Sequence, residues 1–131
     1  MLLLLAALGQ AMAVRAEESC PGEAQGFKRL QGLKFEIAYR WEPTELKVGQ
    51  FFAVEVVDCD GLGVDRIVVD ATMPAHGHGM NYRPIAERIA PGRHRFTGLM
   101  LHMPGTWRFT FTLYKKPNVG FQLTHDVDLK R

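Results

Sequence analysis

Hydrophobic and polar residues follow strand-like patterns in several segments after residue 32, alternating with a period of two in some and forming nearly continuous apolar runs in others. The segment 33–41, LKFEIAYRW, places Leu, Phe, Ile and Tyr between mostly polar residues. Such alternation is typical of a strand with one face on a core. Further strand-like segments, bounded by Pro, Gly or Asn, lie at 50–58, which is β-branched and aromatic, and at 64–72, 82–90, 94–101, 106–115 and 119–129. This pattern predicts an all-β protein, an antiparallel β-sandwich of about seven strands with little helix.

Turn-forming residues separate these segments. Pro43 ends the first of them, and the sequence 60–63, DGLG, supplies the positive φ that a tight turn needs. Pro91-Gly92 and Pro104-Gly105 are predicted hairpin turns, and residues 115–118 are predicted to open the last connection. In the segment after Pro104-Gly105, Trp107 shares its parity with alternating apolar residues. We therefore expect Trp107 to anchor the core.

The first residues have the layout of a secretory signal peptide. A short apolar run, residues 2–8, is followed by small residues, which favours cleavage after Ala16. The run is too short to cross a bilayer, and the alternative for this segment is a buried N-terminal helix. We predict a signal peptide at 1–16, an N-terminal tail at 17–32 and a β-sandwich domain at 33–131, without a transmembrane span in the mature chain. The mature protein is then periplasmic or secreted.

The two cysteines, Cys20 and Cys59, are predicted to form a disulfide. An even number of cysteines in an oxidising compartment favours this pairing, which would fasten the N-terminal tail to the domain. The alternative is free or metal-bound thiols. A site with two soft cysteine ligands usually has close Cys spacing or neighbouring histidines, and Cys59 has neither.

Composition limits the possible functions further. The 131 residues suffice for one domain, and 47% of them are hydrophobic. The formal charge of +2 is the difference between 16 basic and 14 acidic residues spread along the chain, which argues against nucleic-acid binding. The sequence has no paired-carboxylate, phosphate-loop or metallohydrolase motif, so we predict a protein that is not an enzyme.

The donor residues of the chain are concentrated between positions 73 and 103. This stretch contains four of the six methionines and four of the five histidines, namely Met73, His76, His78, Met80, His94, Met100, His102 and Met103. Thioether sulfur is a soft ligand and imidazole a borderline one, so a mixed site suits copper, Cu(I) in particular. Ca²⁺ or Mg²⁺ would need clustered carboxylates.

Spacing selects the expected ligands within this stretch. In an extended backbone, His76, His78 and Met80 would project from one side, and the intervening glycines would let the chain close around an ion. His102 and Met103 are expected to complete the site, with Met103 able to replace Met100. The predicted metal ligands are therefore His76, His78, Met80, His102 and Met103.

Other members of the stretch have simpler explanations. Met73 and Met100, each taken alone, are more typical of core packing than of a ligand. His94, between two arginines, is predicted to be a solvated strand residue. His125 is predicted to be a surface residue or an ion partner of Asp126.

These motifs resemble a known group of envelope proteins. The segments DATMPAHGHGM (70–80), PGRHRF (91–96) and LHMPGTW (101–107) are similar to the YtkA-like and FixH-like periplasmic domains and, more distantly, to CopC-type copper carriers. The resemblance covers about residues 30–130. It implies an immunoglobulin-like β-sandwich in the cell envelope that is associated with copper handling or with assembly of copper-containing oxidases.

Two functions of different classes follow. The first is an exported protein that holds or carries copper and exchanges it with a copper-donating or copper-accepting envelope protein, with zinc on His76, His78 and His102 as a lesser variant. The second is an envelope interaction module in which the same loop contacts a partner protein and no metal binds.

Overall fold

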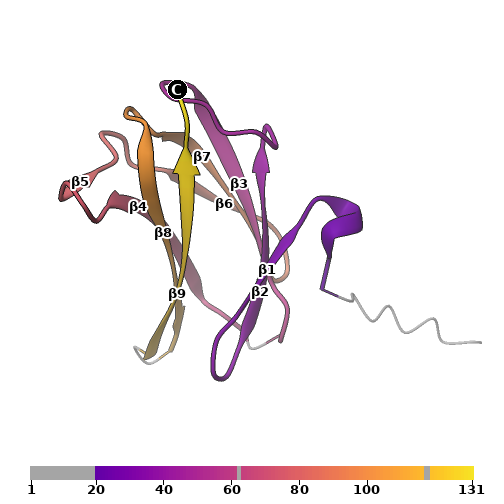
Figure 1. Ribbon diagram of the computed structural model, residues 1–131. Coiled ribbons are helices and arrows are strands. Elements are labelled where there is room, and N and C mark those ends of the chain that lie inside the picture. The colour runs from indigo at the N-terminus through magenta and orange to yellow at the C-terminus, as the bar shows by residue number, and fades with distance from the viewer. Residues whose placement is uncertain (1–19, 62, 117–118) are drawn as a thin grey trace, which may run out of the picture.

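The protein forms two antiparallel β-sheets that face each other (Figure 1). The computed structural model describes residues 20–61, 63–116 and 119–131, and the signal peptide predicted at 1–16 lies outside them. The elements within these residues are the short 3₁₀ helix η1 (Glu23–Gln25) and the strands β1 (Lys28–Gln31), β2 (Glu36–Glu42), β3 (Phe51–Asp58), β4 (Arg66–Met73), β5 (His78–Gly79), β6 (Ile85–Ala90), β7 (Arg93–Met100), β8 (Gly105–Lys115) and β9 (Val119–Leu129). In this part of the chain, no helix is long and apolar enough to span a bilayer.

The strand order is that of an immunoglobulin-like fold. One sheet, sheet A, has the order β1-β2-β3-β7-β6, and the other, sheet B, has the order β5-β4-β8-β9. Without the short strands β1 and β5, these orders match the ABED and CFG sheets of immunoglobulin constant-type domains. All seven predicted strands are present, so the predicted β-sandwich is confirmed. The predicted tail at 17–32 contributes η1 and β1, and β1 pairs with β2.

The core lies between the sheets and is rich in aromatic side chains. Along β8, Trp107, Phe109 and Phe111 are fully buried, as alternation with a period of two requires. The ring of Phe109 lies 4.4 Å from the ring of Trp41 on β2 in the facing sheet, measured between centroids. Tyr39, also on β2, approaches Phe111 to 4.9 Å. The predicted role of Trp107 as a core anchor is confirmed.

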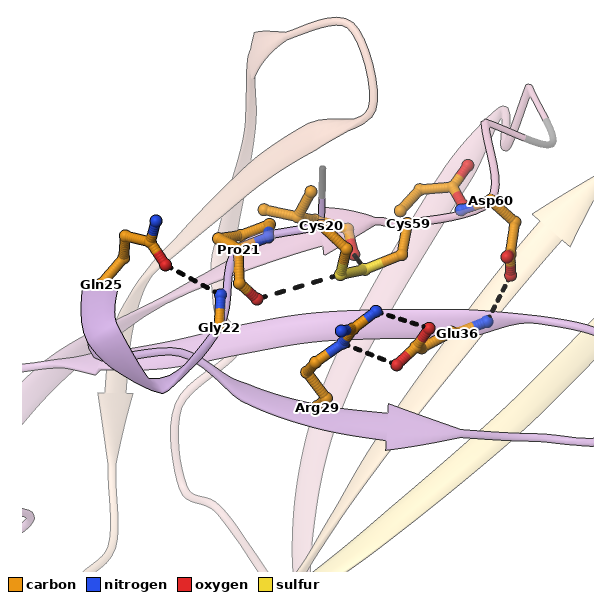
Figure 2. Close-up of a disulfide and its surroundings, with 10 residues drawn as sticks. Cys20, Pro21, Gly22, Gln25, Arg29, Glu36, Cys59 and Asp60 are labelled. Carbon is orange, nitrogen blue, oxygen red and sulfur yellow. Dashed lines mark hydrogen bonds and ion pairs between the residues drawn. A yellow bond between two sulfur atoms is a disulfide. The ribbon is translucent and has the colours of Figure 1, made fainter. Parts of the chain in front are cut away.

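A second, smaller core covers the outer face of sheet A. Phe27, Ala38 and Val57 are buried there, and the two bridged cysteines pack against them. Figure 2 shows the Cys20–Cys59 disulfide itself. The disulfide joins residues 39 positions apart and fastens the segment before β1 to the end of β3. The predicted disulfide is therefore present in the structure.

The turn predictions are confirmed in part. Pro91-Gly92 joins β6 to β7 in a hairpin, and Gly61 has the positive φ expected of the 60–63 turn. Pro104-Gly105 is not a hairpin turn, because β7 belongs to sheet A and β8 to sheet B, so this connection crosses between the sheets. The connection at 115–118 includes residues 117 and 118, which lie outside the described residues.

His94 is buried in the core and is not the solvated residue that the sequence predicted. Its side chain is 7% exposed, and it lies opposite Val56 on β3. Because successive side chains of a strand point to opposite faces, the flanking arginines lie on the outer face while His94 faces inward. Burial lowers the pKa of His94, Arg88 lowers it further, and Asp58 acts in the opposite direction.

His125 is likewise not a simple surface residue. It lies opposite Phe109 on the neighbouring strand, is half-buried, and its Nδ1 forms a hydrogen bond with the Tyr39 hydroxyl of the facing sheet. Burial lowers the pKa of His125, the positive charge of Lys28 lowers it further, and Asp126 opposes this shift. His125 therefore helps to join the two sheets.

The two inward histidines make the fold sensitive to acid. Their pKa values are lowered in the folded state, so the unfolded chain binds more protons below about pH 6.5. We expect full stability above that pH and a loss of up to about 1.4 kcal/mol per pH unit for each histidine as the pH falls toward the folded pKa values. Urea unfolding between pH 7.5 and 5 measures this slope. His94→Phe should reduce the slope, and an unchanged slope would contradict the assignment.

Candidate metal centre

Two connections that carry the predicted ligands lie at the same end of the sandwich. Strand β4 runs antiparallel to β8, with Thr72 opposite Arg108, so the end of β4 lies beside the start of β8. The last residue of β4 and the residues that follow it, 73–80, are called here the histidine turn. The residues that precede β8, 101–104, are called the His102 loop. The pairing of β4 with β8 brings these two segments together although they are far apart in the sequence.

The histidine turn reverses the chain directly after β4. The backbone N–H groups of His76 and Gly77 both donate to the carbonyl of Met73, at 3.1 and 2.9 Å. Gly77 has φ of 64°, in the left-handed region that favours glycine. The expectation of an extended backbone from His76 to Met80 is therefore wrong, because the chain folds back and His78 pairs with Met73.

Three histidine rings form a row across the two segments. The centroids of His76 and His78 lie 6.2 Å apart with stacked rings, and those of His78 and His102 lie 6.5 Å apart. His76 and His78 are exposed, whereas His102 is half-buried. The row thus runs from the exposed histidine turn to the more enclosed His102 loop.

The His102 loop is held from both sides. The carbonyl of Leu101 accepts a hydrogen bond from the backbone of Gly49 at 2.9 Å. The indole N–H of Trp107 donates to the carbonyl of Met103, also at 2.9 Å, and the Trp107 ring meets the His102 ring edge-on at 5.5 Å. The Nδ1 atom of His102 is buried and has no hydrogen-bond partner among the described residues. The buried Nδ1 of His94 has none there either, so this feature supports a ligand role for His102 only together with its proximity to His78.

The end of β4 and the start of β8 also approach each other closely in the core. Gly105 begins β8 with φ of 126°, and a Cβ atom at this position would lie 2.8 Å from the Cε methyl of Met73. Met73 is 1% exposed. The absence of a side chain at Gly105 therefore lets the start of β8 approach the end of β4.

The methionines have different surroundings. Met73 belongs to the core, as predicted, while Met100 is half-buried and lies opposite Phe51. Met80 and Met103, both predicted ligands, are half-buried and pack against the main core. Met80 also lines a cavity of about 510 Å³ between β4 and β6. Their role as ligands stays a prediction.

The geometry brings the rings near one another, but it does not present a complete site. With metal–nitrogen bonds of about 2 Å, two imidazoles on one ion have centroids roughly 5 Å apart in tetrahedral geometry and at most about 6.3 Å apart in linear geometry. The 6.2 Å between His76 and His78 is close to the linear limit, and the 6.5 Å between His78 and His102 slightly exceeds it. In the part of the chain that the structure describes, no three His, Cys, Asp or Glu side chains form a ready-made metal site. A bound ion would therefore need a thioether ligand or a shift of the histidine turn.

Trp107 is the residue whose part in this region the sequence pattern did not reveal. Its position in an alternating strand indicated only core packing, and its indole N–H also supports the His102 loop. The short spacing from Met103 to Trp107, across Pro104-Gly105, is the signal that could have indicated this hydrogen bond.

Comparison with known proteins supports the fold and leaves the chemistry open. No protein-family profile and no curated protein matches the chain. Among solved structures, the chain is similar to a crystal structure of a DUF4426 family protein from Pseudomonas aeruginosa PAO1, with 13% sequence identity and a TM-score of 0.56. The match covers 80% of this chain and 95% of that one. At this identity, the similarity concerns the fold alone.

Proposed function

We propose that the protein is an exported copper-binding protein that holds Cu(I) between the histidine turn and the His102 loop. The observation that carries the proposal is the proximity of His78 to His102, 6.5 Å between ring centroids, although the two residues come from separate connections. The buried, unpartnered Nδ1 of His102 adds a nitrogen suited to coordination. The ligands are His76, His78 and His102, with the thioethers of Met80 and Met103.

The chemistry of the donors favours copper over hard cations. Residues 73–80 and 100–105 contain histidine and methionine and no carboxylate. Thioether and imidazole ligands select Cu(I), whereas Ca²⁺ and Mg²⁺ require oxygen ligands. The exposed histidines of the histidine turn would let an envelope protein that donates or accepts copper reach the ion. The disulfide supports export, because such bonds persist in oxidising compartments.

Cu(I) titration of the purified protein against a chelating competitor tests this function. We expect His76→Ala combined with His78→Ala to weaken Cu(I) binding by more than the roughly 10–100-fold that loss of an outer-shell partner costs. His125→Gln is the histidine control, because His125 contacts Tyr39 on the facing sheet and not the histidine turn. An affinity that is equal in the double variant and the wild type would reject these ligands.

Zinc bound by the three histidines is a variant of the same site. Sulfur K-edge absorption of the loaded protein separates the two, because only thioether ligation changes the methionine signal. We expect a change with Cu(I) and none if nitrogen alone binds the ion.

An envelope interaction module is the second candidate function. Phe51 and Tyr82 are 56% and 48% exposed, and their rings are in contact, with centroids 5.2 Å apart. Phe51 lies opposite Met100, at the same end of the sandwich as the His102 loop. Exposed aromatic residues favour protein contacts. Partner capture that survives chelation and is lost in Phe51→Ser would support this function, whereas capture abolished by chelation supports copper.

A further inference from the structure

Trp107 occupies a position between the core and the metal ligands. Its ring is fully buried, and it lies at the start of β8, the strand whose register with β4 brings the two segments together. Trp107 makes two contacts with the His102 loop. The indole N–H donates to the Met103 carbonyl at 2.9 Å, and the ring meets that of His102 edge-on at 5.5 Å.

These contacts restrain one side of the metal centre and not the other. The His102 loop is held by Trp107 and, through Leu101, by Gly49. In the histidine turn, Met73 and Met80 pack against the core, but His76 and His78 are exposed. Among the described residues, the hydrogen bonds of the turn are those of its own backbone and of the two-residue strand β5. A ligand whose ring and backbone are held in place loses less entropy on binding an ion than a free one.

We propose that Trp107 is a positioning residue for copper, an inference that rests on the proposed function. It holds His102 and Met103 in the orientation that an ion requires, and the exposed His76–His78 pair then closes on the ion. The hydrogen bond to the Met103 carbonyl carries this role, in the way that outer-shell partners orient metal ligands elsewhere. The packing of the ring in the core is a separate contribution to stability.

Two replacements separate the hydrogen bond from the packing. Trp107→Phe keeps an aromatic ring and removes the N–H. Benzothienylalanine at position 107 keeps the shape of the indole and also lacks the N–H, so it changes little else. Phe109→Leu is the matched control, because Phe109 is equally buried on the same strand and packs against Trp41, away from the His102 loop. Each protein is titrated with Cu(I) against a chelator, and its unfolding is followed in urea.

We expect both replacements at position 107 to weaken Cu(I) binding about 10–100-fold, and Phe109→Leu to lower stability while leaving the affinity unchanged. X-ray absorption of the loaded benzothienylalanine protein should show an altered ligand set at unchanged fold. Wild-type affinity in that protein would overturn the positioning role and leave the proposed function intact. Equal loss in Phe109→Leu would also overturn it, since stability alone would then explain the effect. Absence of Cu(I) binding by the wild type would reject both.

Discussion

Replacing Cys20 and Cys59 together by serine is expected to lower the free energy of unfolding by about 4 kcal/mol. The disulfide closes a loop between residues 39 positions apart, and the chain-entropy relation gives a cost of this size for its removal. The small core of Phe27, Ala38 and Val57 depends on the same bond, because it packs beneath the segment that the disulfide fastens. Urea unfolding of the oxidised wild type and the double variant measures the difference.

Reduction of the wild type provides an internal comparison. The reduced protein should unfold at the same urea concentration as the double serine variant, and hydrogen exchange should increase first in β1 and η1. A loss of less than about 1 kcal/mol would show that the N-terminal segment holds its place without the disulfide.

Replacing Gly105 by alanine is expected to destabilise the fold by about 3 kcal/mol. The φ of 126° is one that L side chains rarely adopt, and the new methyl would lie 2.8 Å from the Met73 Cε. The Met73 Cε is the end of a flexible side chain and can shift within the core, so most of the cost comes from the backbone φ. The displaced start of β8 should also move the His102 loop and weaken Cu(I) binding. Thermal and urea unfolding together with copper titration check both effects.

Two variants distinguish the contributions to this loss. Gly79→Ala is the control, because a Cβ there meets nothing within 4 Å and φ is not positive, so its effect should be small. Gly105→Ala combined with Met73→Ala should cost less than the sum of the two single changes, since the contact between the methyl groups is gone. Strict additivity would contradict a contact between these positions.

The strands could be predicted from the sequence because their information is local. Alternation and turn residues located all seven long strands, and the parity of Trp107 with Phe109 identified the inner face of β8. Strand β1, KRLQ, was missed because it has no alternating pattern and forms by pairing its backbone with β2. The prediction that His94 is solvated rested on the two flanking arginines. Its parity with the apolar Phe96 in the same strand indicates the inner face instead.

The site was predictable only as a set of residue types. Composition indicated that His76, His78 and His102 belong together, but their separations depend on the register of β4 with β8. The turn after Met73 depends on two hydrogen bonds to one carbonyl, which the extended interpretation did not include. The link from Trp107 to Met103 joins a core side chain to a loop backbone, and no periodicity shows such a link.

The pairing of β9 with β8 has a practical consequence for handling the protein. Leu129 lies opposite Gly105, so the C-terminus emerges next to the His102 loop, at the upper end of Figure 1. The disulfide fastens Cys20 to Cys59, which directly follows the last residue of β3. Phe51, at the other end of β3, lies at the same end of the sandwich as the His102 loop, so Cys20 lies at the opposite end. A polyhistidine purification tag after residue 131 would therefore lie near the imidazole of His102 and compete with it for a bound ion. A purification tag or surface linker is better attached before Cys20, because the end of the sandwich with the His102 loop then stays accessible.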